Sequence, residues 1–77
     1  MPQLRDIAAI RLLAENVRKY RIEKNMTMEA LANEAGIEYS QISRLERGLL
    51  NTSVSVIFAV AKALKIPPSK LLDEIGN

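Results

Sequence analysis

Apolar residues recur at intervals of three and four along almost the whole chain, and no segment alternates between apolar and polar residues as a β-strand would. Because this spacing places one apolar stripe along a helix, the pattern predicts an all-α fold. The stripes predict helices over residues 4–24, 28–35, 39–47 and 54–65, followed by a short fifth helix within 67–75.

The junctions between these segments hold residues that begin or end helices. Thr27 is a suitable N-cap for the second helix, and either Ser53 or Ser55 can cap the fourth, because a side-chain oxygen there accepts a free N–H of the first turn. Asn and Gly accept the left-handed conformation that ends many helices, and they stand at Asn25, Gly36 and Gly48. Short connections of this kind favour a single domain over residues 1–77.

The same stripes predict which side chains form the core. In the first helix they are Ile7, Ile10, Leu13 or Ala14, and Val17. In the next three helices they are Leu31, Ala32, Ala35, Ile42, Leu45, Val56, Ile57, Val60, Ala61 and Leu64, and in the last helix Leu71, Leu72 and Ile75. The small side chain of Ala32 is expected to let the second and third helices approach closely.

Composition excludes several classes of function. With 77 residues, no Cys and no His, the chain has no disulfide, no thiolate or imidazole catalyst and none of the usual zinc ligands. The paired carboxylates Asp73 and Glu74 lie together near a polar chain end, where we expect no basic or nucleophilic catalytic partner. We therefore expect no enzyme, no cofactor or metal, and no small-molecule substrate or sensing domain.

No apolar run reaches the roughly 18 residues that a membrane span requires. The first residues also lack the basic stretch and uncharged apolar block of a signal peptide. These features predict a cytoplasmic protein with no membrane partner.

The formal net charge is only +2, and a solvated surface accounts for it. The positions of the basic residues are more informative, because four of them fall within residues 18–24 and Arg44 and Arg47 follow in the third helix. Such clusters on short helices are typical of phosphate contacts, so nucleic acid is one candidate partner.

Residues 27–48 carry an extended motif, T-x-E-x-L-A-x-x-A-G-I-x-x-S-x-I-S-R-L-E-R-G. Two short helices joined at a glycine are the geometry of a helix-turn-helix, whose second helix enters the major groove of DNA. The motif resembles the Cro and phage-repressor type (XRE-like) of helix-turn-helix domain, and the similarity extends over about residues 13–75. Small restriction-modification controller proteins and prophage repressors share this pattern.

The resemblance implies one five-helix, lambda-repressor-like domain, within which three parts are distinguished. The first helix begins early, so residues 1–12 form an N-terminal extension; residues 27–48 form the helix-turn-helix; and residues 67–77 form a C-terminal helix and tail. The implied function is that of a sequence-specific regulator of transcription bound to double-stranded DNA. The alternative is a protein-interaction module or antitoxin that kept the fold with weak or no DNA binding.

The resemblance also assigns roles to individual residues. Positions that contact base edges in this family correspond to Tyr39, Ser40, Gln41 and Arg44, with Ser43 close by. Phosphate contacts correspond to Thr27, Met28, Arg47, Asn51 and Thr52, and Arg18 and Lys19 are added by charge. Arg21 and Glu46 correspond to a structural ion pair between the first and third helices.

One position departs from the family pattern. The family usually has Gln directly after the threonine, where its amide braces a phosphate and a side chain of the third helix. Met28 stands there in this chain and can do neither.

The chain carries more apolar residues than a monomer core of this size can bury. Phe58 faces away from the apolar stripe of its helix, the short last helix carries Leu72 and Ile75 besides Leu71, and the early start of the first helix adds Leu4, Ile7 and Ile10. Two arrangements would cover them. The early turns of the first helix can fold back over Phe58, or the C-terminal surfaces of two chains can pair across a two-fold axis. We favour a homodimer centred on Phe58, Leu72 and Ile75, because two domains related by a two-fold axis present two recognition helices to one face of DNA.

Overall fold

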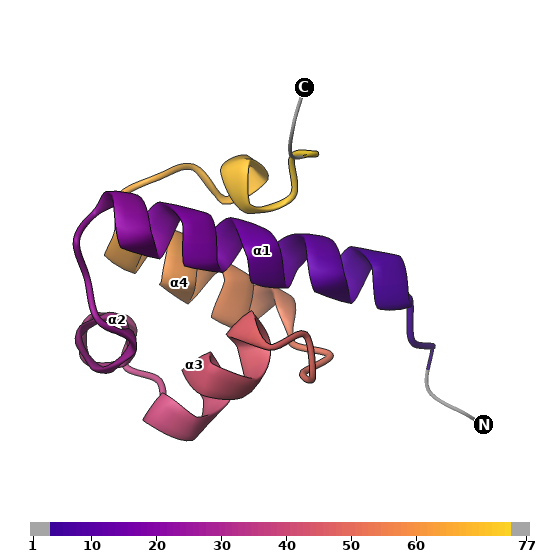
Figure 1. Cartoon of the computed structure of the whole chain (residues 1–77), viewed down its shortest axis with the longest axis horizontal. Coiled ribbons are helices and arrows are strands. Elements are labelled where there is room, and N and C mark those ends of the chain that lie inside the picture. The colour runs from indigo at the N-terminus through magenta and orange to yellow at the C-terminus, as the bar shows by residue number, and fades with distance from the viewer. Residues whose placement is uncertain (1–3, 75–77) are drawn as a thin grey trace.

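The computed structural model describes residues 4–74, which form four α-helices and one short 3₁₀ helix, with no strand in that range. The elements are α1 (Ile7–Glu23), α2 (Met28–Ala35), α3 (Tyr39–Glu46), α4 (Val54–Leu64) and η1 (Pro68–Leu71). The all-α prediction is confirmed. Figure 1 shows α1 running across the molecule, with α2 and α3 on one side of it and η1 on the other.

Three of the four α-helices begin at a side-chain cap. The oxygens of Asp6, Thr27 and Ser53 accept the backbone N–H three residues further on, at 3.0, 3.0 and 3.3 Å. The cap at Thr27 was predicted, and Ser53 is the one of the two serine candidates that is used. Asp6 was missed, so α1 begins at Ile7 rather than near Leu4.

The helix ends depend on left-handed residues. Asn25, Gly36 and Gly48 have φ values of 56°, 70° and 71°, as their positions predicted. Lys65 also adopts this conformation, with φ 58°, and it ends α4 at Leu64 rather than at Lys65. Because Lys is no better suited to this conformation than most residues, no sequence signal marked that end. The other α-helices end within one residue of the prediction.

The core is continuous from α1 to η1. Its fully or almost fully buried apolar side chains are Ile10, Leu13, Ala14, Val17, Leu31, Ala32, Ile42, Leu45, Val60, Ala61, Leu64 and Leu71. Val56 and Ile57 were predicted in the core but are only half-buried. Ile7 is 55% exposed, because the first turn of α1 extends beyond the helices that cover the rest of it. Ile10 is buried within the chain and needs no external cover.

The predicted fifth α-helix is a single 3₁₀ turn, Pro68–Leu71. The side-chain amide of Asn16, which is 2% exposed, donates to the carbonyl oxygens of Leu71 and Asp73 at 2.8 Å each. These carbonyls are thus already hydrogen-bonded, which accounts for the end of the helix. Leu71 is buried and Leu72 is 53% exposed, while the predicted apolar position Ile75 lies outside the described residues.

The start of α1 does not fold back over Phe58, whose side chain is 57% exposed. It lies instead beside the loop between α3 and α4, where the Asn51 side-chain amide donates to the carbonyl of Leu4 at 3.0 Å. That alternative is therefore wrong for residues 4–74, and Phe58 remains uncovered by them.

Candidate nucleic-acid interface

Helices α2 and α3 form a compact pair joined by three residues, of which Gly36 is left-handed. Leu31 and Ala32 of α2 and Ile42 and Leu45 of α3 are buried, so each helix has one face fixed in the core. Ala32 is 2% exposed, which fits its expected role at a close helix contact. The opposite face of α3 is left available to a partner.

The predicted base-contacting residues lie on or beside that outer face. Tyr39, Ser40 and Arg44 are exposed, whereas Gln41 and Ser43 are half-buried. The exposed residues follow helical spacing, with Arg44 one turn after Ser40. The structure therefore brings together one aromatic ring, hydroxyl groups and a guanidinium on a surface of helical width.

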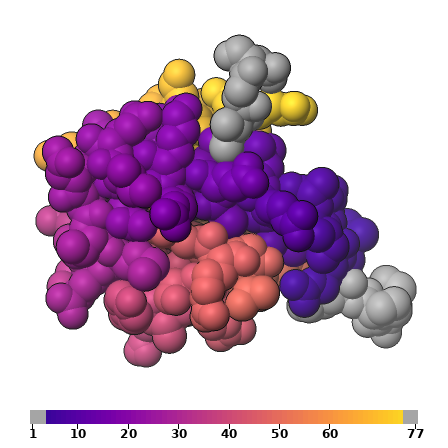
Figure 2. All heavy atoms as spheres, viewed as in Figure 1, coloured from indigo at the N-terminus to yellow at the C-terminus, as the bar shows by residue number. Residues whose placement is uncertain are grey.

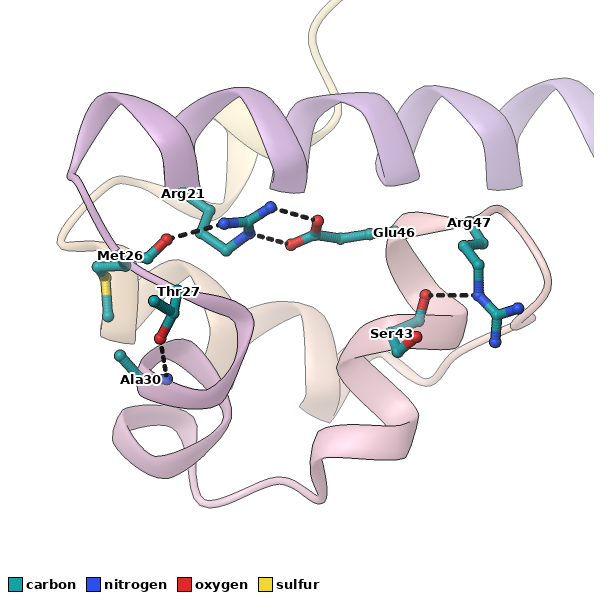
Figure 3. A network of polar contacts seen from close by, with 7 residues as sticks. All are labelled: Arg21, Met26, Thr27, Ala30, Ser43, Glu46 and Arg47. Atoms are coloured by element: carbon teal, nitrogen blue, oxygen red, sulfur yellow. Dashed lines mark hydrogen bonds and ion pairs between the residues drawn. The ribbon is translucent and has the colours of Figure 1, made fainter.

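Arg21 and Glu46 form the ion pair that was expected between α1 and α3 (Figure 3). Arg21 Nε donates to Glu46 Oε2 at 2.6 Å, and Arg21 Nη2 donates to Glu46 Oε1 at 3.0 Å. Arg21 Nη1 also donates to the carbonyl of Met26 at 2.8 Å, just before α2. One guanidinium thus links α1, the end of α3 and the entrance of α2, which fixes the orientation of the helix pair.

The end of α3 is held by a further contact. Arg47 Nε donates to the Ser43 carbonyl at 3.3 Å, so the guanidinium lies beside the last turn of α3 (Figure 3). Figure 2 shows the side chains of α1 packed directly against the end of α3 and the loop that follows it. Arg47 therefore presents positive charge at the edge of the candidate surface.

Arg18 and Lys19 do not lie together on that surface. Arg18 is exposed, and on α1 it lies one turn after Ala14 and one turn before Arg21. Ala14 faces Gly48, just after α3, since a Cβ added at Gly48 would lie 4.0 Å from the Ala14 Cβ. Arg18 therefore lies on the side of α1 that adjoins the end of α3. Lys19 is two residues from Arg21, so it points to nearly the opposite side of α1. Its ammonium lies 4.9 Å from the centre of the Tyr20 ring.

The remaining predicted phosphate contacts are partly engaged within the chain. The Thr27 hydroxyl accepts the Ala30 N–H as the cap of α2, and the Asn51 amide donates to Leu4. Met28 and Thr52 are half-buried. Thr27 keeps its own O–H, and the Asn51 amide keeps its second N–H, so both retain one donor.

Sequence reasoning missed Asn16, although it is the buried polar residue of the described chain. Its partners lie 55 and 57 residues further on, so no local pattern indicates them. The sequence did contain one indication: Asn16 lies three residues after Leu13 and one residue before Val17, so helical spacing places this polar residue close to the core.

The surface formed by α3 and its flanks offers hydroxyl and guanidinium hydrogen-bond donors. Within residues 4–74, no group of three or more His, Cys, Asp or Glu side chains is placed to hold a metal ion. In the same part of the chain, no helix combines the length and the apolar character needed to cross a membrane.

Two short helices that each bury one face, a left-handed glycine between them and an outward polar face on the second define a helix-turn-helix protein. The chain belongs to the helix-turn-helix family, whose family model matches residues 17–71. It is 44% identical over 72 residues to control protein C.BamHI of Bacillus amyloliquefaciens, covering 88% of this chain and 89% of that protein. It is 40% identical over 65 residues to control protein C.SmaI of Serratia marcescens, covering 84% of this chain and 77% of that protein.

Solved structures agree with this assignment. The restriction-modification controller protein C.AhdI from Aeromonas hydrophila superposes with a TM-score of 0.80 at 33% identity, covering 83% of this chain and 97% of that one. The predicted family and fold are thus confirmed, with four α-helices and a 3₁₀ turn in place of five helices.

Proposed function

We propose that this protein is a transcriptional regulator that binds a two-fold-symmetric site in double-stranded DNA as a homodimer. The observation that carries the proposal is the outward polar face of α3, held in place by the core and by the Arg21–Glu46 pair. Its similarity to proteins named control proteins and to a restriction-modification controller protein supports a regulatory role. Such a regulator acts in the cytoplasm and has no catalytic activity.

In this proposal α3 enters the major groove, which is about 12 Å wide and admits one helix. The Arg44 guanidinium suits the O6 and N7 acceptors of guanine, and the Gln41 amide suits adenine. Ser40 and Ser43 are short hydroxyls that accommodate either base, and Tyr39 stands at the first residue of α3. These contacts would give the protein its preference for one sequence.

Phosphate contacts would flank α3. Arg47 at the end of α3 and Arg18 on the adjoining side of α1 supply positive charge, and Thr27, Asn51 and Thr52 supply neutral donors. Lys19 points away from this surface, so we leave it out. The side chain of Met28 has no N–H or O–H to offer a phosphate.

The dimer would form on the C-terminal side of the molecule. Phe58 on α4 is 57% exposed and Leu72 after η1 is 53% exposed, and large apolar side chains exposed in this way favour a protein partner. A shallow hollow beside Phe58 is lined by Ala59, Lys62, Ile66 and Pro68. The contribution of Ile75 rests on the sequence alone.

A mobility-shift assay in the presence of excess nonspecific competitor DNA tests the proposal. We expect binding to a preferred duplex that weakens steeply with salt, because phosphate contacts release counterions. Arg47→Ala should weaken binding to all sequences alike and reduce the salt slope by about one. Absence of binding above the competitor level would favour the alternative, a protein-interaction module that kept the fold.

A further inference from the structure

A shallow hollow lies where the beginning of α2 meets the beginning of α3. It is lined by Arg21, Thr27, Met28, Glu29 and Tyr39. Met28 and Tyr39 are the first residues of their helices, and Tyr39 is 51% exposed while Met28 is half-buried. The hollow therefore borders the end of α3 from which recognition helices contact base edges.

Most polar groups of the hollow are already hydrogen-bonded or are unsuited to a phosphate, and the Thr27 O–H is the side-chain donor that stays available to one. The Arg21 guanidinium donates to Glu46 and to the Met26 carbonyl (Figure 3), and the Thr27 hydroxyl accepts the N–H that it caps. Glu29 adds a carboxylate, which repels a phosphate. The apolar part of the hollow is formed by Met28, which also packs against the core, and by the exposed Tyr39.

We infer that this hollow takes the 5-methyl group of a thymine in the major groove, an inference that rests on the proposed function. The thymine methyl is the one apolar group that an unmodified base pair presents in that groove. A Met side chain adapts its shape to such a group, and an aromatic ring provides a flat apolar wall. Met28, at the position where the family usually has Gln, thus contacts the base through an apolar side chain. Thymine is therefore preferred at one position of each half-site.

The test uses the full chain and its preferred duplex, obtained by selection from random DNA. Each thymine of one half-site is replaced singly by deoxyuridine, which removes only the methyl group. We expect one position at which the replacement weakens binding by about threefold to fivefold, the effect of leaving one methyl unburied. Replacement at the other thymines should change the affinity little.

Variants assign the effect to the hollow. Met28→Gln and Tyr39→Ala should bring the ratio of affinities for thymine and deoxyuridine at that position close to one. Met28→Leu, which keeps an apolar side chain of similar size, should retain most of the ratio. Thermal unfolding of each variant checks that the fold is intact.

The inference fails if no thymine position responds to loss of its methyl group, or if the response persists unchanged in both Met28→Gln and Tyr39→Ala. A selected duplex that depends on Arg44 but is insensitive to deoxyuridine would overturn the inference and leave the proposed function standing. Failure to select any duplex would overturn both.

Discussion

Single residues set the orientation of the candidate DNA-binding surface. The Glu46 side chain is 4% exposed and that of Arg21 is 13% exposed, and two hydrogen bonds join them. Two charges removed from water in this way are compensated by each other, so the loss of one leaves the other buried without a partner. This differs from an exposed ion pair, which contributes at most about 1 kcal/mol.

Glu46→Ala should therefore lower the free energy of unfolding by about 3–5 kcal/mol. Denaturant melts measure this change, and Glu15→Ala is a control, because this exposed carboxylate in the middle of α1 should change stability by no more than about 0.5 kcal/mol. A loss below about 0.5 kcal/mol in Glu46→Ala would mean that the pair behaves as a surface pair in solution.

At the scale of elements, η1 is attached to the rest of the fold by Asn16 and by the buried side chain of Leu71. The short turn has four residues and too few hydrogen bonds of its own to be stable alone. The two bonds from α1 therefore decide where the chain after α4 lies, and with it the exposed side chain of Leu72.

Asn16→Ala should destabilise the protein by about 2–3 kcal/mol, because it leaves two carbonyl acceptors without their donor. Glu15→Ala, an exposed neighbour on the same helix, should change the free energy of unfolding by no more than about 0.5 kcal/mol. Equal urea midpoints for the two variants would show that the amide of Asn16 contributes nothing to the attachment of η1.

The sequence predicted the elements well where the signals are local. Thr27 and Gly36 predicted the two ends of α2 correctly, because a side-chain cap and a left-handed residue at the end of a helix act within one turn. The end of α4 was predicted one residue too late, because the left-handed residue there is Lys65 and not Gly or Asn. The short η1 was not predicted, since the chain after it is held by the distant side chain of Asn16. The candidate base contacts came from the resemblance of the motif, and the sequence alone could not show that Asn51 bonds to Leu4.

At the scale of the whole molecule, one α3 helix offers few base contacts, and a two-fold axis doubles them. Half-sites about 34 Å apart lie on the same face of DNA, since that distance is one turn of the duplex. In the proposed dimer, the exposed apolar residues of α4 and of the segment after η1 would form the contact between the two chains. The proposed function therefore depends on association as well as on α3.

Sedimentation velocity at micromolar concentration should give a species of about twice the 8.6 kDa chain mass, as expected of a two-fold dimer. Phe58→Glu should shift this species toward the monomer while the fold remains intact, because Phe58 is exposed. Ile22→Ser, which changes an exposed apolar residue of α1, should leave the dimer unchanged. A wild-type chain that stays monomeric would contradict the proposed dimer.

The central claim is that α3 selects a DNA sequence, and selection of bound duplexes from random DNA tests it most directly. The wild-type protein should enrich a two-fold-symmetric site, and Arg44→Ala should weaken binding to that site by about 1–3 kcal/mol and relax the preference at one base position of each half-site. An enriched site that is identical for wild type and Arg44→Ala, or no enriched site at all, would contradict the account.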